Sequence, residues 1–480
     1  MSAQAAIQPR TIARRARSGV FYGLTWSGIA CVVIAIAVSF GMIRYGIAST
    51  IAVPIAAICA TLGLVRASGR PLVEWTPIIG VYIYRALTKK TVFTRPLGKP
   101  RVSGTLGLPG DAARLRVIVD EHGTAFIHDP HTRHLTATLR VTHGGTVLLD
   151  PSKQAEFDRG WAKVMDSIAR FDTDIAQVKV IERTLPSGGG LLQEYLANRS
   201  GELVDSEIGK VYESLVAKQG ESLRHESLIA ITLDLGKATT RIREMGGGMT
   251  GGVNLIREVM QTLQSSVSNA GLRAVSWHSE ADLALLIRSV YDPETIPELS
   301  SATIGRKVET SGPMAVSETW NWVQTDSSYH QVFAVTEWPR SAIGLMSMWP
   351  LILTPGVHRT VSIAARPIPA GKSRREARVK VSDSRTEQHR RAKRLGWEDP
   401  EDRAEVAEAE KRLQEVTLHG SREFEFIGLV VVSAPNVDDL RRDARKMRTQ
   451  AQAADVELRP LVAQQAQHLV TAALPVSRGL

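Results

Sequence analysis

Two adjacent residues, His225 and Glu226, could form an acid–base pair of the kind that hydrolases use for proton transfer. A hydrolase also needs a nucleophile or an activated water, and the usual signatures Gly-x-Ser-x-Gly and His-Glu-x-x-His do not occur in the chain. We therefore assign no catalytic residue. A tethered hydrolase that uses this pair remains one hypothesis.

Nucleotide motors hold phosphate with a glycine-rich loop followed by a lysine and a hydroxyl residue that binds magnesium. Gly236 and Lys237 lack the upstream glycine of that loop, and Ala238 stands where the hydroxyl residue would be. The glycine-rich run 246–252 could wrap a phosphate, but no lysine follows it. We interpret this run as a loop between helices and predict no cofactor.

Histidine is a common metal ligand, and five histidines occur close together in the chain: His122, His128, His131, His134 and His143. Residues 128–134 have the pattern of a hairpin turn, whereas metal ligands must converge on one point. The two cysteines, Cys31 and Cys59, lie inside apolar runs, where a thiol behaves as a small hydrophobic group. We predict neither a metal site nor a disulfide scaffold.

The positive charge of the chain is concentrated at one end. The 480 residues carry a net charge of +10, but residues 1–101 hold thirteen Lys and Arg and one acid, Glu74. The rest of the chain has a small negative net charge. This distribution argues against a folded body that coats nucleic acid. The length predicts two to four structural units.

Two long uncharged runs predict a transmembrane hairpin. Residues 20–43 form a run of 24 residues, about 36 Å long as a helix, and residues 45–65 form a second run of 21 after Arg44. Basic residues flank the pair on both outer sides. The positive-inside rule then predicts a multi-pass (two-span) integral membrane protein in the cell membrane, with both termini and the large body cytoplasmic.

Small residues recur every four positions along both runs, which predicts close packing of the two transmembrane helices against each other. The predicted helix-packing residues are Gly23, Ser27, Cys31, Ala35, Ser39, Ala48, Ala52, Ala56 and Ala60. A chance stripe in an alanine-rich span is the alternative. Pro54 is expected to kink the second helix. A following amphipathic segment, with Leu72, Trp75 and Tyr82 on one face, is typical of an interfacial helix.

The fold class predicted for the remainder is a mixed α+β body. We expect a membrane-associated segment at 1–96, a β-rich unit with one helix at 97–190, an α/β unit at 201–370, a charged helical hairpin at 371–420 and a C-terminal βαβ-like segment at 421–480. The predicted helices cover 153–171, 202–218, 253–269, 280–291 and 437–454. The predicted strands include 115–119, 124–128, 135–141, 146–149, 177–182, 228–235, 274–278, 332–337, 360–368 and 424–432.

The charged hairpin combines a basic and an acidic stretch. Residues 372–394 contain ten bases and three acids, and residues 398–410 contain seven acids and one base. We expect two antiparallel helices that attract each other. The alternative is a basic arm that grips nucleic acid, which the scarcity of aromatic residues disfavours. Whether the 372–394 arm contacts DNA is left open.

Several short motifs occur in an order that resembles a known family. They are Glu74-Trp-Thr-Pro77, Leu135-Thr-Ala-Thr-Leu139, Arg224-His-Glu226, the triple glycine at Gly246, Tyr291-Asp-Pro293, Glu337-Trp-Pro-Arg340 and Leu474-Pro-Val-Ser-Arg-Gly-Leu480. With the apolar hairpin, the chain is similar to actinobacterial membrane proteins of conjugation and type IV secretion-like gene sets. These begin with a PrgI-like hairpin, and their body resembles the non-motor N-terminal region of the conjugative secretion ATPase.

The resemblance implies a membrane-anchored, non-catalytic scaffold of a DNA or protein transfer machine. Its implied partners are the lipid bilayer, a separate motor ATPase docked on the cytoplasmic side, channel subunits and further copies of the chain. Direct nucleic acid contact is not expected. The alternatives are a subunit of a type VII secretion membrane complex and a membrane-tethered enzyme of unknown class.

Overall fold

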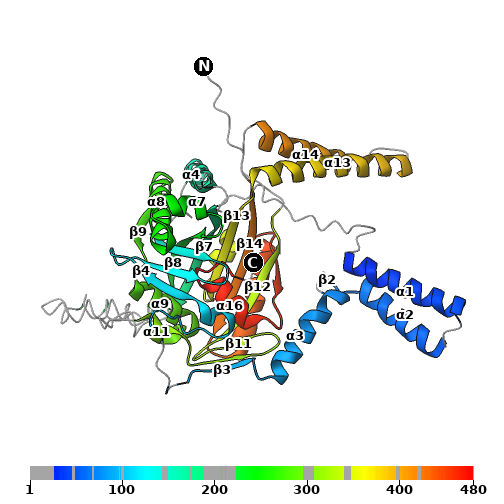
Figure 1. The fold of residues 1–480 in the computed structure, drawn as a ribbon, viewed down its shortest axis with the longest axis horizontal. Helices are drawn as coiled ribbons and strands as arrows, with labels where there is room; N and C mark the ends of the chain where they lie inside the picture. The colour runs from blue at the N-terminus through cyan, green and yellow to red at the C-terminus, as the bar shows by residue number, and fades with distance from the viewer. Residues whose placement is uncertain are drawn as a thin grey trace.

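The body is built around one large antiparallel sheet of 13 strands (Figure 1). The structure, a computed structural model, describes residues 26–45, 49–67, 70–96, 102–142, 150–169, 174–186, 223–295, 307–339, 348–395, 400–418 and 423–478, with a few single residues between them. The main path of the sheet runs in the order β3-β10-β11-β12-β14-β13-β7-β8-β6-β5-β4. Strand β15 adds to β12, and β9 adds to β6.

Four neighbouring strands of this sheet come from a compact βαββαβ unit. Its elements are β6 (His134–Thr142), α4 (Pro151–Ala169), β7 (Ile175–Pro186), β8 (Leu223–Asp234), α7 (Thr239–Glu244), α8 (Gly248–Asn269) and β9 (Arg273–Trp277). The strands lie in the spatial order β9-β6-β8-β7. Numbered along the chain within the unit, this order is 4-1-3-2. A βαββαβ unit whose strands pair in this order has the ferredoxin-like arrangement.

A second unit repeats the same order of elements. It contains β12 (Tyr329–Glu337), α12 (Trp349–Ile352), β13 (His358–Pro367), β14 (Phe424–Ala434), α15 (Val437–Ala453) and β15 (Glu457–Pro460). Its strands lie in the equivalent order β15-β12-β14-β13. The two units join edge to edge, because the second strand of each, β7 and β13, pair antiparallel. The body is therefore an internal structural repeat with an approximate twofold axis between β7 and β13.

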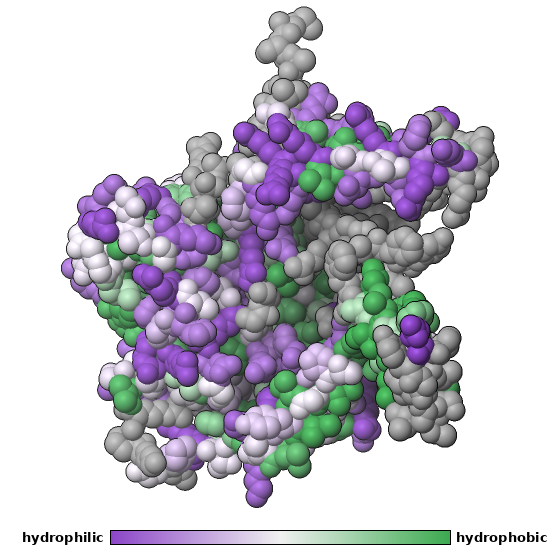
Figure 2. Space-filling model, turned by 45° about the vertical axis from the view of Figure 1, so that its right-hand side comes forward, coloured by the Kyte–Doolittle hydropathy of each residue, from purple (hydrophilic) through white to green (hydrophobic). Residues whose placement is uncertain are grey.

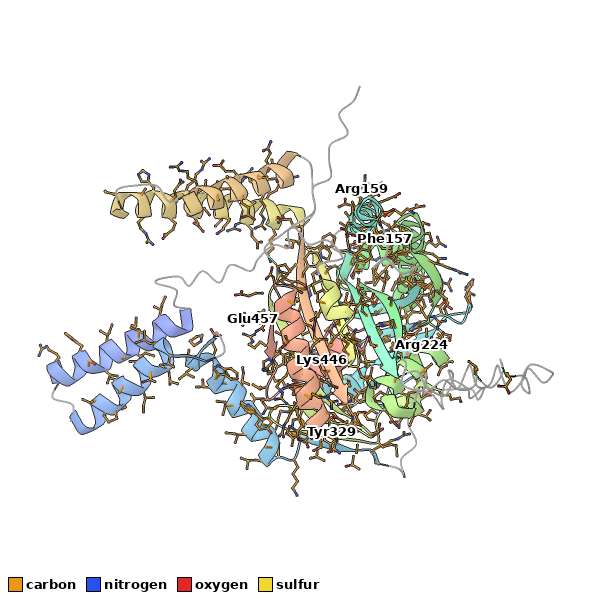
Figure 3. All side chains as sticks on the ribbon, turned by 180° about the vertical axis from the view of Figure 1, so that it is seen from behind. Phe157, Arg159, Arg224, Tyr329, Lys446 and Glu457 are labelled. Carbon is orange, nitrogen blue, oxygen red and sulfur yellow. The ribbon has the colours of Figure 1, made fainter. Side chains whose placement is uncertain are left out.

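The two faces of the sheet are covered by different helices. On one face Val178 packs under α4 and α8, and Val361 packs under α15. Seen from behind, α4 with Phe157 and α15 with Lys446 lie over this side (Figure 3). On the other face Ile181 packs with α9 (Glu280–Tyr291) and α16 (Gln465–Ala473). Because in-register partners across β7 and β13 share a face, each face is continuous through both units.

Helix α8 illustrates how the sequence produces these layers. Its apolar residues recur at three- and four-residue intervals, and Leu255, Val259 and Leu263 are fully buried against the sheet. At its far end Ala270 lies so close to α4 that a Cβ on Gly160 would be 2.9 Å from the Ala270 Cα. Glycine is needed there because any side chain would push α4 away from α8.

Shorter elements complete the described chain. The sheet is extended by β3 (Val92–Thr94), β4 (Arg116–Val119), β5 (Ala125–Asp129), β10 (Ala315–Glu318) and β11 (Val323–Gln324), while β1 (Arg66–Ala67) and β2 (Arg70–Pro71) pair separately. The short helices are η1 (Leu72–Glu74), η2 (Gly110–Arg114), η5 (Pro293–Thr295) and α11 (Val308–Ser311).

Two helical hairpins project from the body (Figure 1). One is N-terminal and consists of α1 (Trp26–Tyr45) and α2 (Ser49–Leu64), followed by α3 (Trp75–Leu87), which leads back to the body. The other is inserted between β13 and β14 and consists of α13 (Ala370–Leu395) and α14 (Pro400–Leu418).

The prediction of a transmembrane hairpin is wrong. Within the described residues, no helix combines the length and apolar character needed to cross a membrane. Helix α1 includes the charged residue Arg44. Helix α2 has only 16 residues, about 24 Å, because it ends at Leu64 and strand β1 begins at Arg66. The predicted two-span membrane protein, with both termini and its body in the cytoplasm, is corrected by the same finding. The mixed α and β character of the body agrees with the prediction.

Most predicted elements correspond to observed ones. The helices expected at 153–171, 253–269, 280–291 and 437–454 are α4, α8, α9 and α15. The strand expected at 146–149 lies outside the described residues, as does the helix expected at 202–218 except for two single helical residues. No sequence pattern indicates the repeat itself, in which strands from three separately predicted units share one sheet.

Candidate functional site

The predicted acid–base pair is divided between the two faces of the sheet. His225 and Glu226 are consecutive residues of β8, so their side chains point in opposite directions. His225 Nδ1 lies 3.2 Å from Thr184 Oγ1, whereas Glu226 Oε2 accepts a hydrogen bond of 3.1 Å from Arg183 on the other face. The two side chains therefore do not act on one bound molecule from these positions.

Glu226 belongs instead to a buried ion pair that sequence reasoning missed. Arg183 is only 2% exposed, and its guanidinium donates to Glu226 and to the hydroxyl of Ser289 on α9. Burial lowers the pKa of Arg183, and the neighbouring carboxylate of Glu226 opposes that shift. The cluster ties β7, β8 and α9 together beside the joint between the units, and it contains no nucleophile positioned by a base.

Lys179 lies on the same face of β7, four residues before Arg183, and is 1% exposed. Its Nζ donates to the carbonyl of Leu474 at 2.9 Å and to that of Thr471, at the end of α16. Burial lowers the pKa of Lys179 to about 7. On the opposite face, burial raises the pKa of Glu182 to about 7, although Ser227 donates a 2.6 Å hydrogen bond to its carboxylate.

The C-terminal segment 474–478 is a strap that connects the second unit to the first. Gln177 donates to the Val476 carbonyl at 3.3 Å, and Ser477 contacts His134. Arg478 donates to the Asp129 carboxylate at 2.7 Å. Burial alone would raise the pKa of Asp129, but hydrogen bonds from Arg478 and from the backbone hold it at about 2. The terminal motif therefore has a clear structural role.

A cavity of about 20 Å³ lies at the joint between the two units, lined in part by Arg183, His330 and Arg359. This volume accommodates a water molecule but not an organic substrate. Burial lowers the pKa of His330 to about 3, and its ring nitrogens lie 2.8 Å from the hydroxyls of Thr325 and Ser433. The ring is thus a neutral, fully hydrogen-bonded part of the core.

The glycine-rich run forms a tight corner between α7 and α8. Gly246, Gly247 and Gly248 all have positive φ angles, which lets the chain reverse within three residues. A Cβ on Gly251 would lie 2.2 Å from the Ile242 carbonyl oxygen of α7. Only Gly246 and Gly247 lie between the helices, and residues 248–252 belong to the start of α8, so the predicted loop is observed only in part.

Replacing Gly251 by alanine is expected to lower the free energy of unfolding by about 1–3 kcal/mol, because α7 must move to make room for the methyl group. Gly80→Ala is the matched control. A Cβ at Gly80 meets no atom within 4 Å, and the helical position should gain about 0.5–1 kcal/mol. Urea unfolding of both variants measures the effect, and equal midpoints would contradict this interpretation.

The histidine cluster is dispersed in the structure. His122 lies 3.0 Å from a guanidinium nitrogen of Arg257. His134 instead contacts Ser477 of the C-terminal segment. His143 lies outside the described residues. Among the residues that the structure describes, no three histidine, cysteine or acidic side chains converge on a common point. Lys237 of the Gly-Lys motif pairs with Asp234 at the end of β8.

Part of the predicted small-residue stripe lies between α1 and α2. A Cβ on Gly63 would be 2.9 Å from the Gly28 carbonyl and 3.1 Å from the Cys31 Cβ, so the helices touch through small residues. Ala35 is buried, and Ser39 is exposed with its hydroxyl donating to the Ala35 carbonyl at 2.8 Å. Ala56 and Ala60 are half-buried. Gly23 and Ala48 lie outside the described residues, as do the side chains of Ser27 and Ala52.

The outer sides of the N-terminal helices expose large apolar side chains. Ile36 is 64% exposed and Phe40 62% exposed on α1, and Leu87 at the end of α3 is 80% exposed. Figure 2 shows the resulting hydrophobic area on this part of the molecule. Contiguous exposed apolar surface of this kind is typical of a binding surface rather than of a free face.

Helix α3 fastens this apolar module to the body. Arg85 forms a 2.5 Å ion pair with Glu318, whose carboxylate is buried on β10. The ring of Tyr82 packs edge-on against Trp320 at 5.1 Å between centroids. Tyr82, which was predicted to lie on the apolar face of an interfacial helix, therefore faces the body. Helix α3 contacts the body through both Arg85 and Tyr82.

The second projecting hairpin, α13 with α14, has a largely hydrophilic surface (Figure 2). Ala377, Val381 and Ala409 are buried between its helices. Arg385 pairs with Glu410 across the hairpin at 2.6 Å. The attraction expected between the basic and acidic stretches is present at this pair. Several cations of α13, among them Arg374, Arg375 and Arg378, are exposed.

Comparison with known proteins does not assign the chain. No protein-family description matches the sequence, and no curated protein matches it.

Proposed function

We propose that this protein is a non-catalytic scaffold of a conjugative, type IV secretion-like transfer machine, in which it holds a separate motor ATPase. The observation that carries the proposal is the apolar module α1–α3, which is exposed on its outer side and fixed to the body through Arg85 and Tyr82. A surface presented in this way suits a partner that must be held in a set position. The sequence resemblance supplies the kind of machine.

The body supports the same proposal through its packing. Its joint holds a water-sized cavity, and its buried charged groups Arg183, Lys179 and Glu226 bind each other, a serine hydroxyl or backbone carbonyls. Groups that are engaged in this way stabilise a fold and offer no space for a substrate. A rigid double unit with projecting hairpins is well suited to connect other proteins.

Deleting the gene from an active conjugative element should abolish transfer, and the full-length chain should restore it. The double variant Ile36→Asp, Phe40→Asp should restore transfer about 100-fold less well, because burying unpaired carboxylates in an apolar contact costs several kcal/mol. Both side chains are exposed in the free protein, so the fold should tolerate the change. Transfer frequency in mating assays is the measurement.

The matched control is Ser265→Asp, Ser268→Asp, which adds the same charge to exposed positions of α8 and should complement fully. Undiminished transfer after gene deletion would contradict the scaffold role. Loss of type VII secretion with normal conjugation would favour the alternative secretion complex.

A further inference from the structure

One side of α13 carries a row of cations that the scaffold proposal does not use. We call this row the basic stripe and define it by its five members, Arg374, Arg375, Arg378, His389 and Lys393. At 100° per residue, these positions fall within a sector of about 100° on the helix, and they extend over about 28 Å along its axis. Ala377 and Val381, which are buried toward α14, border this sector next to Arg374.

The basic stripe is exposed and is not neutralised within the described part of the chain. All five side chains are exposed, and none has an acidic partner among the described residues. The acids of α13 lie on another flank, where Glu376 pairs with Lys372 and Glu387 pairs with Arg390. Arg385 falls within the same sector, but it pairs with Glu410 across the hairpin and is therefore not counted in the stripe.

The chemistry of the stripe fits a phosphate backbone better than a protein surface. Protein interfaces are usually centred on buried apolar or aromatic side chains. Helix α13 contains no aromatic residue, and its exposed aliphatic side chain, Val379, lies outside the sector. Binding to a nucleic acid backbone needs only regularly placed cations, whereas base stacking would need aromatic rings.

We propose that the basic stripe of α13 binds the sugar-phosphate backbone of a nucleic acid without reading its bases. This interaction is additional to the scaffold role and does not depend on it. The chain beyond residue 101 has a small negative net charge, so the stripe is a local concentration of positive charge within that part. Backbone contacts of this kind release counterions, so the affinity should fall steeply as salt is added.

The test uses the full-length protein and fluorescence anisotropy with a labelled 30-base-pair duplex and a single strand of the same length, as a salt series. The triple variant Arg374→Gln, Arg375→Gln, Arg378→Gln should weaken binding at least tenfold at low salt. It should also reduce the slope of log affinity against log salt by about 3. Thermal unfolding of the variant should be unchanged, because the three side chains are exposed and unpaired.

The control variant removes three exposed cations from other helices, Arg159→Gln, Arg441→Gln and Arg445→Gln, and should bind as the parent protein does. Equal losses in both triple variants would overturn the proposal, because net charge alone would then explain binding. Absence of binding to both nucleic acids would also overturn it. Binding of polyglutamate through the stripe, with no nucleic acid bound, would identify an acidic protein as its partner and contradict the proposal.

Discussion

Replacing Arg183 by alanine is expected to lower the free energy of unfolding by about 3–5 kcal/mol. The guanidinium is almost completely buried and binds Glu226 and Ser289. Removing it leaves the carboxylate of Glu226 largely buried without its counter-charge. Urea unfolding followed by circular dichroism measures the loss.

Two further variants separate the buried charge from other causes. Arg224→Ala removes an exposed cation from the same part of β8 and should change stability by less than about 0.5 kcal/mol. The double variant Arg183→Met, Glu226→Leu should regain much of the loss, since an apolar pair replaces an ion pair of similar size. A loss below about 1 kcal/mol in Arg183→Ala would contradict the proposed role of this cluster.

The second large effect concerns pH. Burial raises the pKa of Glu182 to about 7, so the folded protein binds a proton that the unfolded chain releases between pH 4.5 and 7. This carboxyl therefore makes the wild-type protein less stable as pH rises through that range. Glu182→Gln should lack this loss, and its stability relative to wild type should rise by about 3 kcal/mol between pH 4.5 and 7.

Lys179 acts in the alkaline range. Burial lowers its pKa to about 7, so between pH 7 and 10.5 the unfolded chain holds a proton that the folded protein has lost. The wild-type protein should therefore gain stability from this group as pH rises above 7. Lys179→Met should lack this gain, so its free energy of unfolding relative to wild type should fall by about 3 kcal/mol between pH 7 and 9.5.

Urea unfolding at closely spaced pH values from 5 to 9.5 measures both differences. The comparison with wild type at each pH is essential, because buried histidines such as His330 also titrate. A constant difference between Glu182→Gln and wild type would show that this carboxyl is not buried as described. The same outcome for Lys179→Met would remove the amine from the contact with α16.

Sequence patterns predicted individual elements well where a single periodicity governs them. The four-residue spacing of Leu255, Val259 and Leu263 is typical of α8, because one face of this helix meets one sheet. The apolar run before Arg66 shows the limit of such reasoning. Its lack of charge indicated one long helix, but the ends of a helix depend on local contacts, and here the chain turns into β1 and β2.

The repeat and the buried charges were not predictable in the same way. The pairing of β7 with β13 joins residues that are about 180 positions apart, and no local pattern reports such a contact. Arg183 and Glu226 each occur in a strand whose polar residues also suit an exposed face. The alternation of side chains along β8 could have shown that His225 and Glu226 point in opposite directions.

The central claim, that the chain holds a motor ATPase, is tested most directly by cross-linking the tagged full-length protein in cells with a lysine-reactive reagent and identifying partners by mass spectrometry. Lys89 and Lys90 follow α3 and are exposed beside the apolar module. We expect cross-links from these lysines to a conjugative-type motor ATPase, with loss of the links in Ile36→Asp, Phe40→Asp. Recovery of the chain alone, or with a type VII motor only, would contradict the claim.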